Sequence, residues 1–231
     1  DGQAATFSDL SSAPATLEAS KAVDAYGLLP GNGLESSDAE QAYVQAELKG
    51  AETWVRLPKD RWPASWKHME DPVVPLKLAL YGHPDAGGCW EEHCTEQLLE
   101  AGFVAVPEWP SVYFHPRLQL LLMAYVDDFK LAGPRGNMRE GWDLIRKRIK
   151  ADEPAPVGRC LGCEHELSTE KRGSRVVQKI TYNMQPFLED CVKAYLDLAQ
   201  KPRSSLKYAA TPFIEETRER VCGDLDDPEE E

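Results

Sequence analysis

The sequence has no apolar run of about eighteen residues or more, so nothing in it predicts a membrane span. Its first residues, Asp1-Gly2-Gln3, contain neither an initiator methionine nor a basic stretch followed by an apolar one, and so show no secretory signal. We therefore expect a fragment of a longer polypeptide that works inside the cell.

A dense cysteine framework is also missing, since six cysteines are spread over 231 residues, which favours free thiols in a reducing compartment. The chain has no excess of basic charge. Its formal net charge of −13 argues against nucleic-acid binding, because phosphate contacts need Lys and Arg. The distribution weakens this objection: residues 214–231 hold nine acidic and two basic residues, whereas residues 130–150 hold seven basic and two acidic ones.

Two adjacent carboxylates, Asp127 and Asp128, follow Tyr125-Val126 and the apolar run of residues 118–124. A packed core would hold such a pair in place at the end of a strand, and two close carboxylates do not both ionise cheaply without a cation. The motif therefore predicts a metal site at a tight turn. An ordinary solvated turn is the alternative for these four residues alone.

Two further blocks precede this motif. In residues 38–48, Tyr43 stands five positions after Asp38, and residues 78–90 lead into an amphipathic helix. The three blocks, in this order and spacing, resemble the reverse transcriptase domain of copia-type retrotransposon polyproteins. The family reads Asp-Val-Lys-x-Ala-Phe-Leu-x-Gly-x-Leu, then Leu-Tyr-Gly-Leu-Lys-Gln-Ala-Pro-x-x-Trp, then Tyr-Val-Asp-Asp.

The resemblance runs from about Phe7 to about Ile214, with quieter matches at residues 54–58, 101–103, 161–163 and 210–212. It departs at residues 83–87, where Asp85 stands in place of a family glutamine whose amide contacts the incoming nucleotide. This departure favours an alternative function, a catalytically silent relative retained as a nucleic-acid or protein interaction domain.

The resemblance implies an RNA-directed DNA polymerase that transfers nucleotides from dNTPs to a primer on an RNA or DNA template. It also implies the remainder of a Pol polyprotein as a partner, in the cytoplasm or in virus-like particles. The reaction uses two Mg²⁺ ions, with Mn²⁺ as a substitute, and carboxylate oxygens are their preferred ligands. Asp38 and Asp127 are the expected catalytic metal ligands, with Asp128 as the third carboxylate.

The residues expected to contact the substrate are Tyr43, Gly82, Asp85 and Tyr125. In the family, the aromatic residue matching Tyr43 fills the space that a ribose 2′-hydroxyl would need. A core aromatic is the alternative for Tyr43 and for Tyr125. Gly82 has no side chain, so it would let a ligand come close to the backbone. The alternative is that this glycine only makes the segment before the helix flexible.

A third function is a zinc-stabilised structural module. Cys160, Cys163 and His165 form a Cys-x-x-Cys-x-His group, with thiolates and imidazole as preferred zinc ligands, and further candidates are Cys89, His93 and Cys94. Residues 160–163 also read as a strand, and no second close pair completes the usual zinc spacing. Buried free thiols are the commoner outcome for such cysteines.

Hydrophobic spacing predicts helices over residues 15–26 and 86–101, from Asn137, and from Pro186 with an inward apolar face. Asp85 is expected to cap the second helix, Gly102 to end it, and Asn137 to begin the third as a capping box. Strands are expected over residues 34–37, 53–57, 112–114, 118–126 and 129–131, with residues 61–75 as a surface connection.

The resulting order of strand, helix, strand, strand, helix, strand predicts an α+β fold. With the resemblance, it indicates a polymerase palm of the split βαβ, ferredoxin-like type, with partial fingers and the start of a thumb. The expected division is a flexible remnant at residues 1–13, fingers and palm at 14–166, a thumb-like segment at 167–213, and an acidic tail at 214–231.

Overall fold

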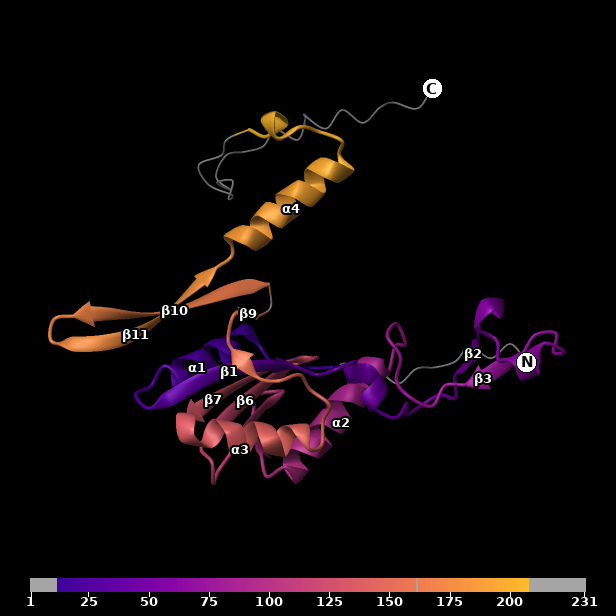
Figure 1. The fold of residues 1–231 in the computed structure, drawn as a ribbon, viewed down its shortest axis with the longest axis horizontal. Coiled ribbons are helices and arrows are strands. Elements are labelled where there is room, and N and C mark those ends of the chain that lie inside the picture. Colours follow the sequence, from indigo (N-terminus) through magenta and orange to yellow (C-terminus); the bar gives the residue numbers. More distant parts are fainter. Residues whose placement is uncertain (1–11, 161, 208–231) are drawn as a thin grey trace. The chain divides into compact units, whose positions relative to one another are not determined.

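The computed structural model describes residues 12–160 and 162–207, and the chain forms two units that meet between Met184 and Gln185 (Figure 1). The acidic tail expected over residues 214–231 and the family match at residues 210–212 lie outside the described residues. Most of the remnant expected at residues 1–13 lies outside them as well.

The first unit is an α+β structure built on a six-stranded antiparallel sheet of order β4-β5-β6-β7-β1-β8. As predicted, the apolar run of the sequence forms a strand of the central hairpin, β6–β7. The strands are β1 (Asn32–Asp38), β4 (Val104–Ala105), β5 (Val112–His115), β6 (Leu120–Tyr125), β7 (Asp128–Pro134) and β8 (Ala155–Pro156).

Helices cover both faces of this sheet (Figure 1). They are α1 (Leu17–Gly27), α2 (Ala86–Glu100) and α3 (Arg135–Arg146). Because successive residues of a strand point to opposite faces, β6 contributes to two cores. Leu120 and Leu122 pack in the core that α2 and α3 share, whereas Met123 packs in the core beneath α1.

The buried faces of α2 and α3 were predicted correctly. Trp90 and Leu98 of α2 are buried in the same core as Trp142 and Ile145 of α3, and Ile149 is buried just beyond the end of α3. Apolar side chains at helical spacing were therefore sufficient to identify the side of each helix that faces the sheet.

The predicted start of α3 is wrong by two residues. The helix begins at Arg135 with Pro134 in the N-cap position, and Asn137 lies inside it. Instead of capping the helix, the Asn137 side-chain amide donates a hydrogen bond to the carbonyl oxygen of Leu118, at 2.9 Å. A contact with a distant strand thus replaced the local capping bond that the sequence suggested.

The ends of α2 follow the sequence pattern more closely. Gly102 has φ +95 just beyond the helix, the left-handed conformation expected for a glycine at that position. At the other end, Asp85 occupies the N-cap position but its side chain makes no capping hydrogen bond. The prediction that Asp85 caps the helix is therefore right about position and wrong about the interaction.

A small two-stranded sheet joins β2 (Trp54–Arg56) to β3 (Val73–Pro75). The prediction of a surface connection over residues 61–75 is wrong at its end, since Val74 pairs with Val55 of β2. β3 has only three residues, too few for an alternation of apolar and polar side chains to predict a strand. Single 3₁₀ turns are η1 (Ala42–Gln45), η2 (Lys59–Arg61) and η3 (Ala64–Trp66).

A third sheet has the order β11-β10-β9, with strands β9 (Arg159–Cys160), β10 (Cys163–Arg172) and β11 (Arg175–Asn183). The prediction of one strand through residues 160–163 is wrong. Cys160 pairs with Cys163 across a turn in which Gly162 has φ +75, so these residues reverse the chain.

The second unit contains α4 (Gln185–Leu198) and a 3₁₀ turn, η4 (Arg203–Ser205). Pro186 stands in the first turn of α4, as predicted. The inward apolar face is not found, because no residue of α4 is buried among the described residues; the exposed fractions are 56% for Leu188, 54% for Tyr195 and 87% for Leu198. None of the described helices has the length and apolarity needed to cross a membrane.

Candidate active site

Three acidic residues lie close together where β1 ends and β7 begins. Asp38, the last residue of β1, lies directly opposite Asp128, the first residue of β7. Val126 and Asp127 form the two-residue turn from β6 to β7, and the Ala39 amide donates to the Asp127 carbonyl oxygen at 2.7 Å. The fold thus brings together acidic residues about ninety positions apart.

The electrostatics of this cluster are concentrated on Asp128, which is half-buried, whereas Asp38 and Asp127 are exposed. Burial raises the pKa of Asp128, and the charges of Asp38 and Asp127 and a hydrogen bond with Asp38 raise it further, to about 6. Neighbouring negative charge therefore disfavours ionisation of Asp128. A proton relieves this repulsion, and a bound cation would relieve it in the same way.

The turn that carries Asp127 has an unusual backbone. Val126 has φ +56, a left-handed conformation that β-branched residues rarely adopt. The two-residue hairpin turns that match strand twist need such a conformation, usually supplied by glycine. Trp90 of α2 donates from Nε1 to the Val126 carbonyl oxygen at 2.7 Å, so a buried indole helps to hold the turn.

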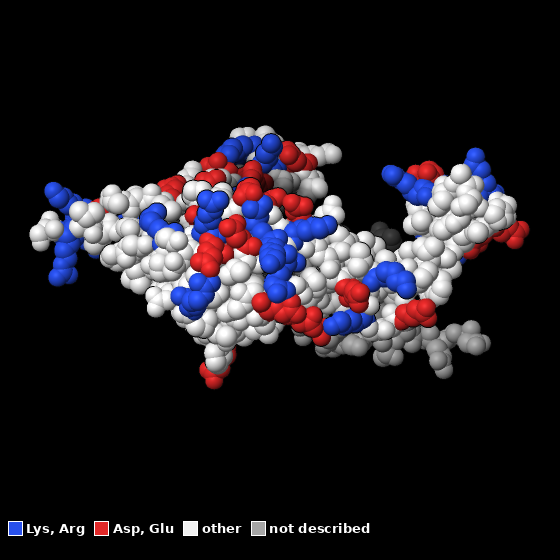
Figure 2. Space-filling view, turned by 60° about the horizontal axis from the view of Figure 1, so that its bottom comes forward, with Lys and Arg blue, Asp and Glu red and all other residues white. Residues whose placement is uncertain are grey.

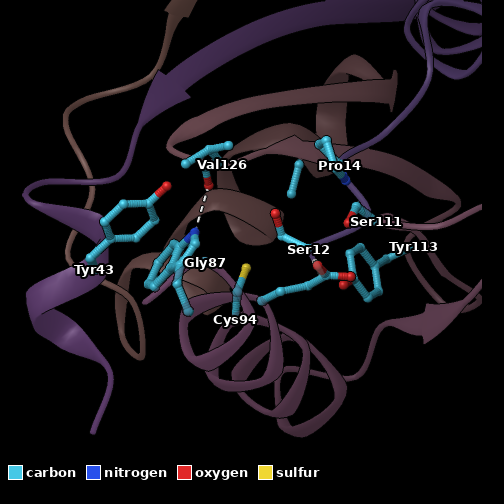
Figure 3. A pocket seen from close by; sticks show the side chains of 11 residues that line it. Ser12, Pro14, Tyr43, Gly87, Cys94, Ser111, Tyr113 and Val126 are labelled. Carbon is cyan, nitrogen blue, oxygen red and sulfur yellow. Dashed lines mark hydrogen bonds between the residues drawn. The ribbon is translucent and has the colours of Figure 1, made fainter. Parts of the chain in front are cut away.

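Tyr43 lies beside this turn, on η1. Its ring packs against Tyr81, with the ring centroids 4.4 Å apart. Burial raises the pKa of Tyr43, and the charges of Tyr81 and Asp127 add to the effect, which places the phenol within electrostatic reach of the acidic turn. Tyr43 and Val126 line one small cavity that is partly open to solvent (Figure 3).

The other expected substrate residues lie in different surroundings. Tyr125 is half-buried and packs in the core beneath α1. Gly82 is exposed in a turn with φ +93 and has open space where a side chain would project. Asp85 is 0% exposed, and no described residue forms a hydrogen bond with either carboxylate oxygen. As it stands, the Asp85 carboxylate is inside the protein rather than on the surface near Asp127.

A buried ion pair beneath α1 was not predicted. Lys130 Nζ is 2.9 Å from Asp24 Oδ1, and Lys130 also donates to Ser20 Oγ at 2.7 Å. Tyr182 donates its hydroxyl to Asp24 Oδ2 at 2.9 Å, and His165 Nε2 lies 3.5 Å from that oxygen. The available signal was a lysine alternating with apolar residues in a strand, and an aspartate among the small apolar residues of a predicted helix.

Competing effects act on the pKa of Asp24. Burial alone would raise it, but hydrogen bonds from His165, Lys130 and Tyr182 and the positive charge of Lys130 outweigh burial and lower it. Lys130 lies two positions from Asp128 on β7, so both side chains are on the same face of the sheet. The ammonium group also opposes the rise in the pKa of Asp128.

Basic side chains of residues 130–150 are partly neutralised. Besides Lys130 with Asp24, Arg146 forms an ion pair with Glu153, and Arg148 forms one with Glu100. Figure 2, turned toward the side of α3, shows Lys and Arg interspersed with Asp and Glu rather than a continuous basic surface. The number of basic residues in this stretch therefore overstates the positive charge that is available to a nucleic acid.

The acidic cluster has the donor chemistry of a Mg²⁺ site but not a preformed ligand arrangement. Carboxylate oxygens suit this hard cation, and the raised pKa of Asp128 marks an excess of negative charge. Within residues 12–160 and 162–207, no three His, Cys, Asp or Glu side chains are placed to hold a metal ion.

The zinc alternative has less support from the geometry. Cys160 and Cys163 are close across the β9–β10 turn, but His165 directs Nε2 toward Asp24 and Lys130, and its Nδ1 lies 3.0 Å from the Cys163 carbonyl oxygen. The cysteines of the described part are free thiols. His165 is thus part of the buried ion-pair cluster.

Comparison of the chain with protein-family models gives no match, and comparison with curated proteins gives none either. The family resemblance carried by the three sequence blocks therefore stays a prediction.

Proposed function

We propose that this chain is the palm-containing part of an RNA-directed DNA polymerase of the copia type. The observation that carries the proposal is the meeting of Asp38 with Asp127 and Asp128 at the end of a strand ladder. Each of these residues belongs to a sequence block that resembles the family. If the resemblance of these blocks to the family were accidental, there would be no reason for residues so far apart in sequence to lie together in the fold.

Strand order supports a palm of the split βαβ type. Both β1 and β6 run antiparallel to β7, so they run parallel to each other with β7 between them. By the same reasoning, β7 and β8 run parallel with β1 between them. The helices α2 and α3 lie in these two connections and pack in one core, the arrangement of a ferredoxin-like palm.

In this proposal, Asp38, Asp127 and Asp128 would hold two Mg²⁺ ions. Bound ions would stabilise the negative charge on the attacking and leaving oxygens of nucleotidyl transfer. The chain itself fixes where the carboxylates stand: Trp90 holds the Val126 carbonyl, and the Ala39 amide holds that of Asp127. A site placed by strand ends and a buried indole is positioned more rigidly than one on a free loop.

Tyr43 would act as the sugar filter, since its phenol lies within electrostatic reach of Asp127 on one side of the turn. Its ring packs against Tyr81, and this contact limits its movement on one side. A ring that cannot move aside excludes a ribose 2′-hydroxyl by contact, whereas a mobile ring would yield.

A second candidate, a catalytically silent relative that binds nucleic acid or protein, is favoured by Asp85. The residue stands where the family has a nucleotide-contacting amide, yet its carboxylate is fully buried and no described group bonds to it. The ion pairs of Arg146 and Arg148 also reduce the positive charge available to a template.

Primer extension tests the polymerase proposal. The chain is incubated with a primed RNA template, dNTPs and Mg²⁺ or Mn²⁺, and compared with Asp127→Asn and with Asp143→Asn as a matched control. Asp143 is exposed on α3, outside the acidic cluster. We expect Asp127→Asn to abolish extension, because an amide is a poor Mg²⁺ ligand, and Asp143→Asn to retain it.

Extension that survives Asp127→Asn would remove this cluster from the reaction. If the parent chain binds primer-template at low salt but extends nothing in either metal, and Asp85→Gln restores nothing, the interaction-domain function replaces the polymerase.

A further inference from the structure

Cys160 and Cys163 are a cross-strand pair at the β9–β10 turn. Residues directly opposite in an antiparallel ladder project to the same face. The His165 amide bonds to the Gly158 carbonyl oxygen two positions along the same ladder, so Cys160 and Cys163 are a hydrogen-bonded pair with Cα atoms about 5.5 Å apart. This distance lies within the range of about 4.4–6.8 Å that disulfides span, and a bond requires the Cβ atoms to approach to about 3.5–4.5 Å. Both thiols are free, so the ladder holds two sulfurs on one face, and a bond between them needs a local tightening of the ladder.

The same charged groups act on both thiols. Burial raises the pKa of Cys160 and of Cys163, and the Lys130 ammonium opposes the rise in both, while Asp24 adds to it. The register of the ladder puts both side chains on one face, and both thiols lie within the field of the same buried ion pair. Cys160 is buried and Cys163 is half-buried, so a reagent in solution reaches Cys163 first.

We propose that Cys160 and Cys163 form a reversible disulfide, with a low-molecular-weight disulfide such as oxidised glutathione as the oxidant. The Cys163 thiolate attacks one sulfur of that disulfide, which forms a mixed disulfide and releases one thiol. The Cys160 thiolate then attacks the Cys163 sulfur and releases the second thiol. The protein loses two protons and two electrons, and the small disulfide gains them as two thiols.

The disulfide would restrain the first residues of β10, where the β10–β11 hairpin begins. The Cys163 carbonyl oxygen lies 3.0 Å from His165 Nδ1, and the His165 amide donates to the Gly158 carbonyl oxygen at 2.7 Å. His165 in turn faces the ion pair of Asp24 and Lys130. A covalent link at this turn therefore restrains the start of β10 at the ion-pair cluster. This inference does not depend on the polymerase proposal.

Peptide mapping after native oxidation tests the disulfide. The whole chain is incubated with oxidised glutathione in EDTA, alkylated, and digested with trypsin. Cleavage after Arg159 and Lys171 leaves both cysteines in one peptide. We expect that peptide to resist alkylation and to weigh two hydrogens less, and reductant to reverse both changes. Hydrogen exchange of the His165 amide should slow in the oxidised protein.

Cys163→Ser should block the change, and Cys191→Ser, at an exposed cysteine of α4, should leave it intact. A glutathione adduct that persists on Cys163 of the unaltered chain would overturn the proposal, because Cys160 would then be out of reach. A bridge that forms only in urea would also overturn it. Zinc retained by the purified chain, at a stoichiometry lost in Cys160→Ser, would identify a metal site instead.

Discussion

Lys130 on β7 and Asp24 on α1 form an ion pair with both side chains buried, Nζ and Oδ1 being 2.9 Å apart. A buried ion pair adds little net stability, because the cost of desolvating both charges offsets their attraction. Removing one partner is strongly destabilising, because the other charge is then buried without compensation. The pair also links the helix to the sheet on the face that carries Asp128. Its energetic role is therefore best measured by removing one partner and then both.

Lys130→Met should lower the free energy of unfolding by about 3–5 kcal/mol, because it leaves the Asp24 carboxylate buried with only His165 and Tyr182 as partners. Lys130→Met combined with Asp24→Leu should recover part of that loss. Urea unfolding gives both values. Lys67→Met, at an exposed residue, is the control, expected within about 0.5 kcal/mol of the parent. A double variant less stable than the single one would show that Asp24 is held mainly by its other partners.

Asp128→Asn should stabilise the protein at pH 8 and have no such effect at pH 4. The pKa of Asp128 rises from 3.8 to about 6 on folding, so its ionisation opposes folding. The penalty is absent below pH 4, grows between pH 4 and 6, and is complete above pH 6. Allowing for partial exposure, we expect a gain of about 1–2 kcal/mol at pH 8.

Thermal unfolding from pH 4 to pH 8 measures this gain. Asp127→Asn, at the exposed neighbour, should give a smaller one. Equal gains at every pH would mean that the amide improves packing rather than removing charge repulsion.

Gly141→Ala should destabilise the protein by about 1–3 kcal/mol, although alanine is the better helix former. A Cβ at Gly141 would clash with Cδ1 of the fully buried Leu120, so either this side chain or α3 would have to shift within a packed core. Gly136→Ala in the same helix meets nothing within 4 Å and should stabilise by about 0.5–1 kcal/mol. Denaturant midpoints for the two variants should therefore shift in opposite directions. Parallel shifts would contradict the close packing of α3 on β6.

Tyr43→Ala should raise the use of ribonucleotides relative to deoxynucleotides, provided that the polymerase proposal holds. The ring lies close to the acidic turn, and its removal opens space beside the sugar. The ratio of kcat/KM for the two nucleotide types measures the effect. Tyr81→Phe, which keeps the ring packed against Tyr43, is the control and should leave the ratio unchanged. An unaltered ratio in Tyr43→Ala would make Tyr43 a structural aromatic.

Features with a strong local signal were predictable from the sequence. The apolar run before Asp127 gave the β6–β7 hairpin, and Trp90 and Trp142 identified the buried sides of α2 and α3. Periodicity works here because burial selects one side of each element. In contrast, β1 has Glu35, Ser36 and Ser37 among its residues, and only the family resemblance located Asp38 at its end.

The remaining errors arise where distant contacts override local preference. Asn137 bonds to Leu118 instead of capping α3, and Cys160 and Cys163 reverse the chain where a strand was expected. The burial of Asp85 depends on segments around Gly50 that lie far away in sequence. The partner of Lys130 was equally hidden, because a buried lysine is identified only when its acidic neighbour is known.

The ladder between β1 and β7 also sets the order in which the acidic cluster can form. A hairpin such as β6–β7 closes within about 1–10 μs because its partners are adjacent in sequence. Pairing Asp38 with Asp128 closes a loop of about ninety residues, a slower and entropically costlier step. A partly folded chain would thus carry Asp127 and Asp128 on a formed hairpin while Asp38 was still unpaired. The complete cluster exists only once β1 has paired with β7, so it reports that the two ends of this long loop have come together.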